Sequence, residues 1–170
     1  LVPGLPESAV RRIVARADGV PLYAVETVRM LVAEGRLELR DDRYVPVGDL
    51  DDLAVPETLT ALIAARLDAL DPFDRGLVQH AAVLGQSFTL GALAAVSSTA
   101  EPELEPRLRA LVRRELLTVE ADPRSPERGQ YAFVQALIRE VAYNTLAHRD
   151  RKERHLAAAR YFESLGSDEL

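Results

Sequence analysis

A helix followed by two short strands is predicted by residues 102–134, which read PELEPRLRALVRRELLTVEADPRSPERGQYAFV. Apolar residues recur after Pro102 at the spacing of one helix face, which is formed by Leu104, Leu108, Leu111 and Val112. Residues 117–121 alternate between apolar and polar, as a half-buried strand does. A loop rich in Pro, Arg and Gly separates them from a second strand at residues 130–134. The stretch therefore predicts a helix and a β-hairpin.

Two more helices are predicted directly upstream. Asp71 has the side chain of an N-cap and Pro72 fits the first helical position, so one helix begins there. Its buried stripe is predicted to contain Phe73, Leu77, Ala81 and Leu84. Thr89 can cap a second, shorter helix. Three helices followed by a β-hairpin are the layout of a winged helix, which we assign to residues 55–147 together with an apolar helix at its start.

A smaller helical region precedes this domain. Two amphipathic patterns flank the turn Asp18-Gly19-Val20-Pro21, and the second is predicted to bury Ala24, Val25, Val28, Leu31 and Val32. Gly19 fits the position just past a helix end, and Pro21 fits the start of the next helix. Residues 37–46 then alternate like two short strands around an Asp-Asp turn. We assign residues 1–54 to a helical subdomain with a short β-hairpin. The simplest interpretation of the turn at residues 18–21 is a connection between two helices.

The end of the chain is predicted to be helical again. One apolar stripe contains Leu137, Ile138, Val141, Ala142 and Leu146, and the next contains Leu156, Ala159 and Phe162. Residues 148–170 are therefore predicted to form a C-terminal helix, which could begin a helical repeat. The predicted fold class is mainly α, with a winged-helix domain between a helical subdomain and C-terminal helices.

Composition indicates a folded, globular protein. The 170 residues are 48% hydrophobic and 28% charged, and no segment approaches the roughly 18 uninterrupted apolar residues of a membrane span. Cysteine is absent, which fits a reducing compartment and leads us to expect a cytoplasmic protein. The net charge of −6 disfavours a general attraction to nucleic acid or anionic lipid. Met30 is the single methionine, so we expect the sequence to be a piece of a larger protein.

The motifs of common catalytic sites are missing from the sequence. A P-loop needs a glycine directly before its lysine, and none of the nine glycines is followed by lysine. There is neither a Gly-x-Ser-x-Gly motif nor a cysteine nucleophile. His80, His148 and His155 lack the spacing of a shared metal site. We therefore expect no catalytic activity, metal or cofactor in this stretch of chain by itself.

Arginines on the third helix and the hairpin leave DNA binding open as an alternative. Winged helices commonly place this helix in the major groove. The candidate contacts are Arg107, Arg109, Arg113 and Arg114 on the helix, and Arg124 and Arg128 on the hairpin. Glutamates alternate with them at Glu101, Glu103, Glu105 and Glu115. Alternating charge is more typical of a salt-bridged face or a protein contact, so DNA is the less favoured partner.

Three stretches carry a resemblance to a known family. The first is ADGVPLYAVE at residues 17–26. The second runs from VPETL at residues 55–59 to AAVLGQSF at residues 81–88, and the third is YAFVQALIREVAY at residues 131–143. In their order and spacing they resemble the C-terminal part of the nucleotide-binding module of STAND-class signalling ATPases. Such modules occur in bacterial LuxR-type transcriptional regulators and in cyclase-associated ATPases.

The resemblance implies a regulatory switch rather than a complete enzyme. Residues 1–54 would be the helical lid, a P-loop domain would precede it, and the winged helix would close over bound ATP or ADP in the inactive state. Gly19 and Pro21 would sense the nucleotide, with the proline contacting its adenine side. A proline suits this role because it offers an apolar face and has no N–H.

The resemblance also implies a role for Gln135 and a set of partners. Many relatives carry a histidine at this position, whereas Gln135 can donate a hydrogen bond but brings no positive charge to a phosphate. The expected partners are the protein's own upstream nucleotide-binding domain and a downstream repeat or output domain, in transcriptional regulation or cyclase signalling. A stand-alone winged-helix module that binds DNA is the alternative.

Overall fold

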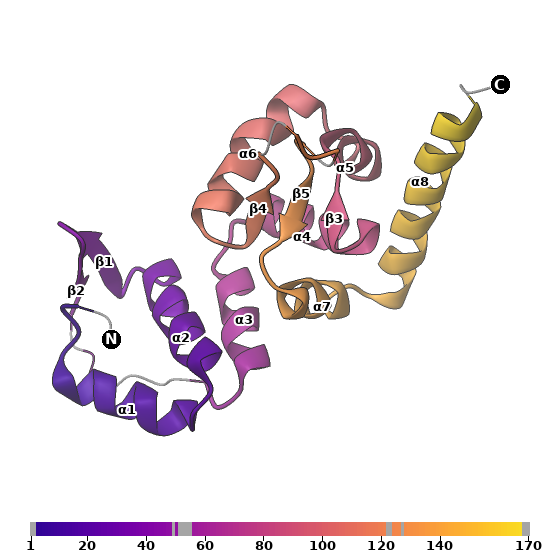
Figure 1. Ribbon diagram of the computed structural model, residues 1–170. Helices are drawn as coiled ribbons and strands as arrows, with labels where there is room; N and C mark the ends of the chain where they lie inside the picture. Colours follow the sequence, from indigo (N-terminus) through magenta and orange to yellow (C-terminus); the bar gives the residue numbers. More distant parts are fainter. Residues whose placement is uncertain (1–2, 49, 51–55, 122–123, 127, 168–170) are drawn as a thin grey trace. The chain divides into compact units, whose positions relative to one another are not determined.

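The computed structural model describes residues 3–48, 50, 56–121, 124–126 and 128–167. The fold is mainly helical with two small antiparallel sheets, which confirms the predicted class at this level (Figure 1). The chain divides into two compact units, Leu1–Ala69 and Leu70–Leu170. The predicted division after residue 54 falls outside the described residues, so the assignments 1–54, 55–147 and 148–170 stay predictions.

The described residues of the first unit form a β-hairpin and three helices. In chain order they are α1 (Glu7–Ala17), α2 (Pro21–Ala33), β1 (Leu37–Arg40), β2 (Arg43–Pro46) and α3 (Leu59–Asp68). The hairpin lies where the sequence predicted it, with β1 antiparallel to β2. Asp41 and Asp42 turn the chain with φ values of 49° and 59°, the positive values that a tight two-residue hairpin turn requires. α3 packs on α2 in this unit, whereas the sequence-based division grouped it with the winged-helix region.

The centre of the first unit is α2. Its buried side chains are Tyr23, Glu26, Thr27, Val28, Met30 and Leu31. The sequence pattern had placed Val25 and Val32 on this face, but these side chains are 44% and 41% exposed. The prediction was wrong there because the pattern counted apolar residues only, whereas Glu26 and Thr27 are buried with hydrogen-bond partners.

In the second unit, the part of the chain that the structure describes forms a three-stranded sheet and five helices. In chain order its elements are α4 (Pro72–Leu84), β3 (Ser87–Phe88), α5 (Leu90–Ser97), α6 (Glu101–Arg113), β4 (Leu117–Val119), β5 (Tyr131–Phe133), α7 (Ala136–Asn144) and α8 (His148–Ser167). β5 lies in the middle and pairs antiparallel with both β3 and β4 (Figure 1). The sequence predicted β4 and β5, but β3 is too short to carry a pattern.

Two helices of the second unit begin at the predicted N-caps. The Asp71 carboxylate accepts the N–H groups of Phe73 and Asp74, both at 3.0 Å. The Thr89 hydroxyl accepts the N–H of Ala92 at 3.1 Å. Each cap satisfies backbone donors that have no partner within their own helix, so α4 and α5 have defined starting points.

Two predicted buried stripes are corrected by the structure. Phe73 is exposed at the start of α4, and the guanidinium of Arg107 lies over its ring, 5.2 Å from the centroid. On α8, Leu156, Ala159 and Phe162 are exposed, and Ala158 is the buried residue instead. Near the start of α8 a charged residue makes the contact to the preceding segment: Arg151 donates to the Leu146 carbonyl and lies over the Tyr143 ring.

Candidate functional site

The turn between α1 and α2 is a tightly fixed corner. Asp18 leaves α1 in the left-handed region with φ 42°, and Gly19 follows with φ 79°. Val20 is extended, and its N–H donates to the Ala17 carbonyl at 2.7 Å. Pro21 then occupies the first turn of α2, so the prediction of a corner between two helices is confirmed. Gly19, Val20 and Pro21 are all exposed and present an apolar surface at a backbone whose direction is set on both sides.

A buried ion pair holds the helix that carries this corner. The Glu26 side chain has no exposed surface, and its carboxylate is bonded to Arg66 of α3, which is 3% exposed. Arg29, one turn further along α2, donates to the same carboxylate at 2.8 Å. Tyr23 adds a bond from its hydroxyl to the Pro56 carbonyl at 2.5 Å. These contacts fix α2 against α3 within two turns of Pro21.

Sequence reasoning missed this pair. The signal it could have used is a glutamate inside a run of apolar residues, because a buried charge requires a partner. Arg66 lies 40 positions away in sequence, so nothing local identifies it as that partner.

Gln135 lies in the second unit, at the junction of β5 and α7. It is the N-cap residue of α7 with an extended backbone, and its carbonyl accepts the N–H of Ile138 at 3.1 Å. Its side chain makes no capping bond to the helix. Gly19 and Pro21 belong to the first unit, so the three predicted nucleotide-sensing residues are divided between two units.

The arginines proposed for DNA differ in their surroundings. Arg107 forms salt bridges to Asp71 at 3.1 Å and to Asp74 at 3.3 Å, in addition to its contact with Phe73. Arg109 pairs with Glu105 on the same helix at 2.7 Å. Arg113, Arg114, Arg124 and Arg128 are exposed. Arg107 and Arg109 are therefore used within the chain.

The acidic partners of Arg107 have opposite pKa shifts. The backbone N–H of Asp74 is the largest cause that lowers the pKa of Asp71. Burial raises the pKa of Asp74, and the neighbouring Asp71 adds to this effect. The positive charge of Arg107 acts on both carboxyl groups in the lowering direction, although the pKa of Asp74 stays raised. Arg107 therefore favours the charged form of both carboxylates at the α4–α6 junction.

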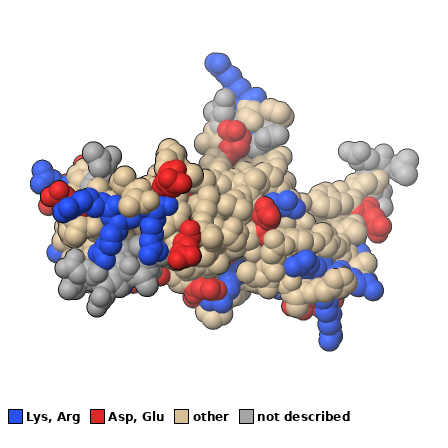
Figure 2. Space-filling view, turned by 90° about the horizontal axis from the view of Figure 1, so that it is seen from below, with Lys and Arg blue, Asp and Glu red and all other residues tan. Residues whose placement is uncertain are grey.

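Charge of both signs is distributed over the surface. On the face shown in Figure 2, acidic side chains are interspersed with basic ones instead of leaving one continuous basic stripe. This distribution agrees with the net charge of −6 and with the internal pairing of Arg107 and Arg109. It favours protein contacts over binding to a phosphate backbone.

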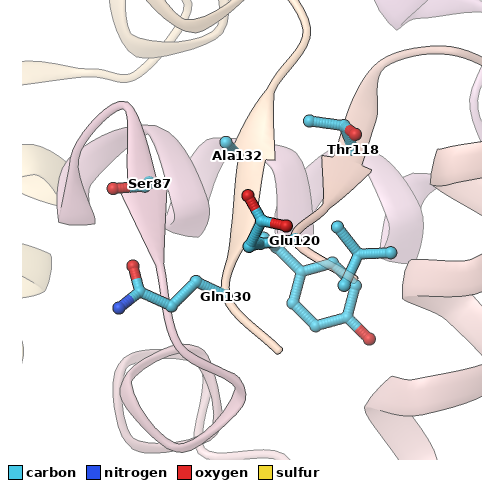
Figure 3. A pocket seen from close by; sticks show the side chains of 7 residues that line it. Ser87, Thr118, Glu120, Gln130 and Ala132 are labelled. Atoms are coloured by element: carbon cyan, nitrogen blue, oxygen red, sulfur yellow. The ribbon is translucent and has the colours of Figure 1, made fainter. Parts of the chain in front are cut away.

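A small hollow lies on one face of the three-stranded sheet (Figure 3). Its volume is about 130 Å³, and it is lined by Ser87, Thr118, Val119, Glu120, Gln130, Tyr131 and Ala132. The sequence did not predict this hollow, because β3 was not predicted and because the lining residues come from three separate parts of the chain. Among the described residues of the lining, Glu120 is the only one with a charged side chain.

The described residues contain no group of three or more His, Asp or Glu side chains that could hold a metal ion. In that same part of the chain, no helix has both the length and the apolar character needed to cross a membrane. Comparison with protein-family models, with curated proteins and with solved structures finds no match for this chain.

Proposed function

We propose that this chain is the lid and winged-helix part of an ATP-dependent signalling switch of the STAND class. The observation that carries the proposal is the order of elements in the second unit, which is α4, β3, α5, α6, β4 and β5. The second hairpin strand, β5, lies in the middle of the sheet. This order is typical of a winged helix and follows the first unit along the chain, as the resemblance requires.

In this proposal the Gly19-Pro21 corner senses the nucleotide. Its exposed proline offers a flat apolar surface to a base, and the fixed backbone on both sides keeps that surface in one orientation. The Glu26–Arg66 pair acts at a distance, because it holds α2 and therefore the position of Pro21. The phosphates would be bound by the P-loop domain expected upstream, and the winged helix would report the state to the output domain.

The test uses the natural protein with its preceding sequence included. ADP affinity is measured by titration calorimetry for the unmodified protein and for Pro21→Ala, with weaker binding of several-fold expected for the variant. The matched control is Pro72→Ala, which changes a proline at the same helix position of α4. An upstream region without a Gly-x4-Gly-Lys-Ser/Thr motif, or an affinity that Pro21→Ala leaves unchanged, would contradict the proposal.

A stand-alone DNA-binding module is the second candidate. It is favoured by the exposure of Arg113 and Arg114 near the end of α6 and of Arg124 and Arg128 on the hairpin. If it is correct, the chain binds duplex DNA with an affinity that falls steeply with salt, and Arg113→Ala with Arg114→Ala weakens that binding. Arg149→Ala, which removes an exposed arginine of α8, is the control. No binding at low salt would rule this candidate out.

A further inference from the structure

The hollow on the sheet is produced by the size and order of the side chains on one face. In the pairing of the strands, Ser87 of β3 and Thr118 of β4 both lie opposite Ala132 of β5. Alternation along the strands puts these three on one face and leaves Phe88 and Phe133 on the other, where both are buried. The three side chains on the open face are small, so a shallow depression crosses the sheet (Figure 3).

A carboxylate and an amide also line the depression. The backbone N–H of Glu120 donates to the Gln130 carbonyl at 2.9 Å, so the pairing of the hairpin continues one step beyond β4 and β5. This step keeps the side chains of Glu120 and Gln130 on the same face as Ser87, Thr118 and Ala132. Both are half-buried and line the depression. The site therefore combines one negative charge with hydroxyl and amide oxygens.

From this lining we infer that the depression binds the guanidinium group of an arginine on a partner polypeptide. A carboxylate with several neutral acceptors matches the planar, multiple donors of a guanidinium, and the volume of about 130 Å³ suits a side-chain head group rather than a whole cofactor. The Glu120 carboxylate would repel an anion. An apolar group would exclude water from the polar lining without forming hydrogen bonds to it. Glu120 also has an interaction within the chain, so a bound guanidinium competes with it and binding is weak. This inference is independent of the proposed nucleotide switch.

The test is an NMR titration of the chain with N-acetyl-arginine amide. We expect saturable shifts of the backbone amides of Ser87, Thr118, Glu120 and Ala132, with a dissociation constant in the millimolar range at low salt. N-acetyl-citrulline amide has nearly the same shape without the charge, and binding about tenfold weaker is expected for it. Glu120→Gln should weaken the arginine probe by about the same factor. Glu140→Gln, which changes an exposed glutamate of α7 outside the lining, should leave the affinity unchanged.

Three results would overturn the inference. They are the absence of saturable shifts at these amides, equal binding of the citrulline probe, and an affinity that Glu120→Gln leaves unchanged. The amide spectrum of Glu120→Gln recorded without probe shows whether the sheet is intact, and Thr118→Val provides a second variant that removes one oxygen and keeps the shape of the side chain. Thr118→Val should weaken the arginine probe by a few-fold.

Discussion

Replacing Arg66 with methionine is expected to destabilise the first unit strongly and to leave the second unit folded. Glu26 is fully buried and pairs with Arg66, which is 3% exposed, and with Arg29, whose side chain is 22% exposed. Arg66→Met removes the more deeply buried of these two cations and leaves the carboxylate inside the unit. Breaking a buried ion pair costs about 3 to 5 kcal/mol, and we expect the lower end because Arg29 remains.

The assay is amide hydrogen exchange, read separately for each helix. A loss of about 3 kcal/mol corresponds to exchange roughly a hundredfold faster in α2 and α3 when these helices exchange by unfolding of the unit. The helix α4 belongs to the second unit and is the internal control, so its exchange should not change. Arg66→Lys keeps the charge and should have a smaller effect than Arg66→Met.

A double variant separates the charge from the packing. Glu26→Leu combined with Arg66→Met removes the carboxylate as well as the guanidinium, and apolar replacements of a buried pair are often neutral or stabilising. We therefore expect exchange in α2 to return close to that of the unmodified protein. The reasoning is refuted if Arg66→Met alone leaves exchange in α2 unchanged, or if the double variant is no more stable than that single variant.

Three further predictions concern stability. Arg107→Ala should cost about 1 kcal/mol in urea unfolding because it removes the salt-bridge partner of Asp74, a nearly buried carboxylate of α4. Arg109→Ala breaks only an exposed pair and should cost close to nothing. Gly4→Ala should destabilise the first unit by about 1 to 3 kcal/mol, because Gly4 has φ 100° and a Cβ would collide with a backbone carbonyl of β2. Gly76 lies inside α4 with open space around it, so Gly76→Ala should instead stabilise the second unit by about 1 kcal/mol in the same urea unfolding. Burial lowers the pKa of His80 to about 4 from 6.5, so as the pH decreases through this range the unfolded chain binds a proton that the folded state does not. The urea midpoint of the second unit should therefore decrease as the pH is lowered from 6.5 to about 4. His80→Gln should make the midpoint depend less on pH.

Local chemistry made part of the fold predictable from sequence. The caps at Asp71 and Thr89 depend on a side chain and the backbone two or three residues away, and both are confirmed. The corner at Gly19 and Pro21 depends on backbone preferences of single residues, although the first left-handed residue proved to be Asp18. Such features need no knowledge of distant parts of the chain.

Features that depend on distant residues could not be predicted. β3 consists of two residues and exists because β5, more than 40 positions later, supplies its hydrogen-bond partners. Glu26 is buried because Arg66 is available on α3, whereas a hydrophobic pattern assigns both to the surface. Since the hollow beside Ala132 requires β3 as well, the proposed guanidinium site was not visible in the sequence.

The arginines of α6 show why counting charges is insufficient to assign a partner. In sequence, Arg107 and Arg109 look equivalent to Arg113 and Arg114, since all four lie on one predicted helix. In the structure, Arg107 forms a salt bridge to Asp71 at the start of α4, and Arg109 forms one to Glu105. If either arginine bound a phosphate, its salt bridge would have to break. A DNA contact that used Arg107 or Arg109 would consequently compete with contacts inside the chain, so we expect fewer phosphate contacts than the sequence suggests and a correspondingly smaller salt dependence.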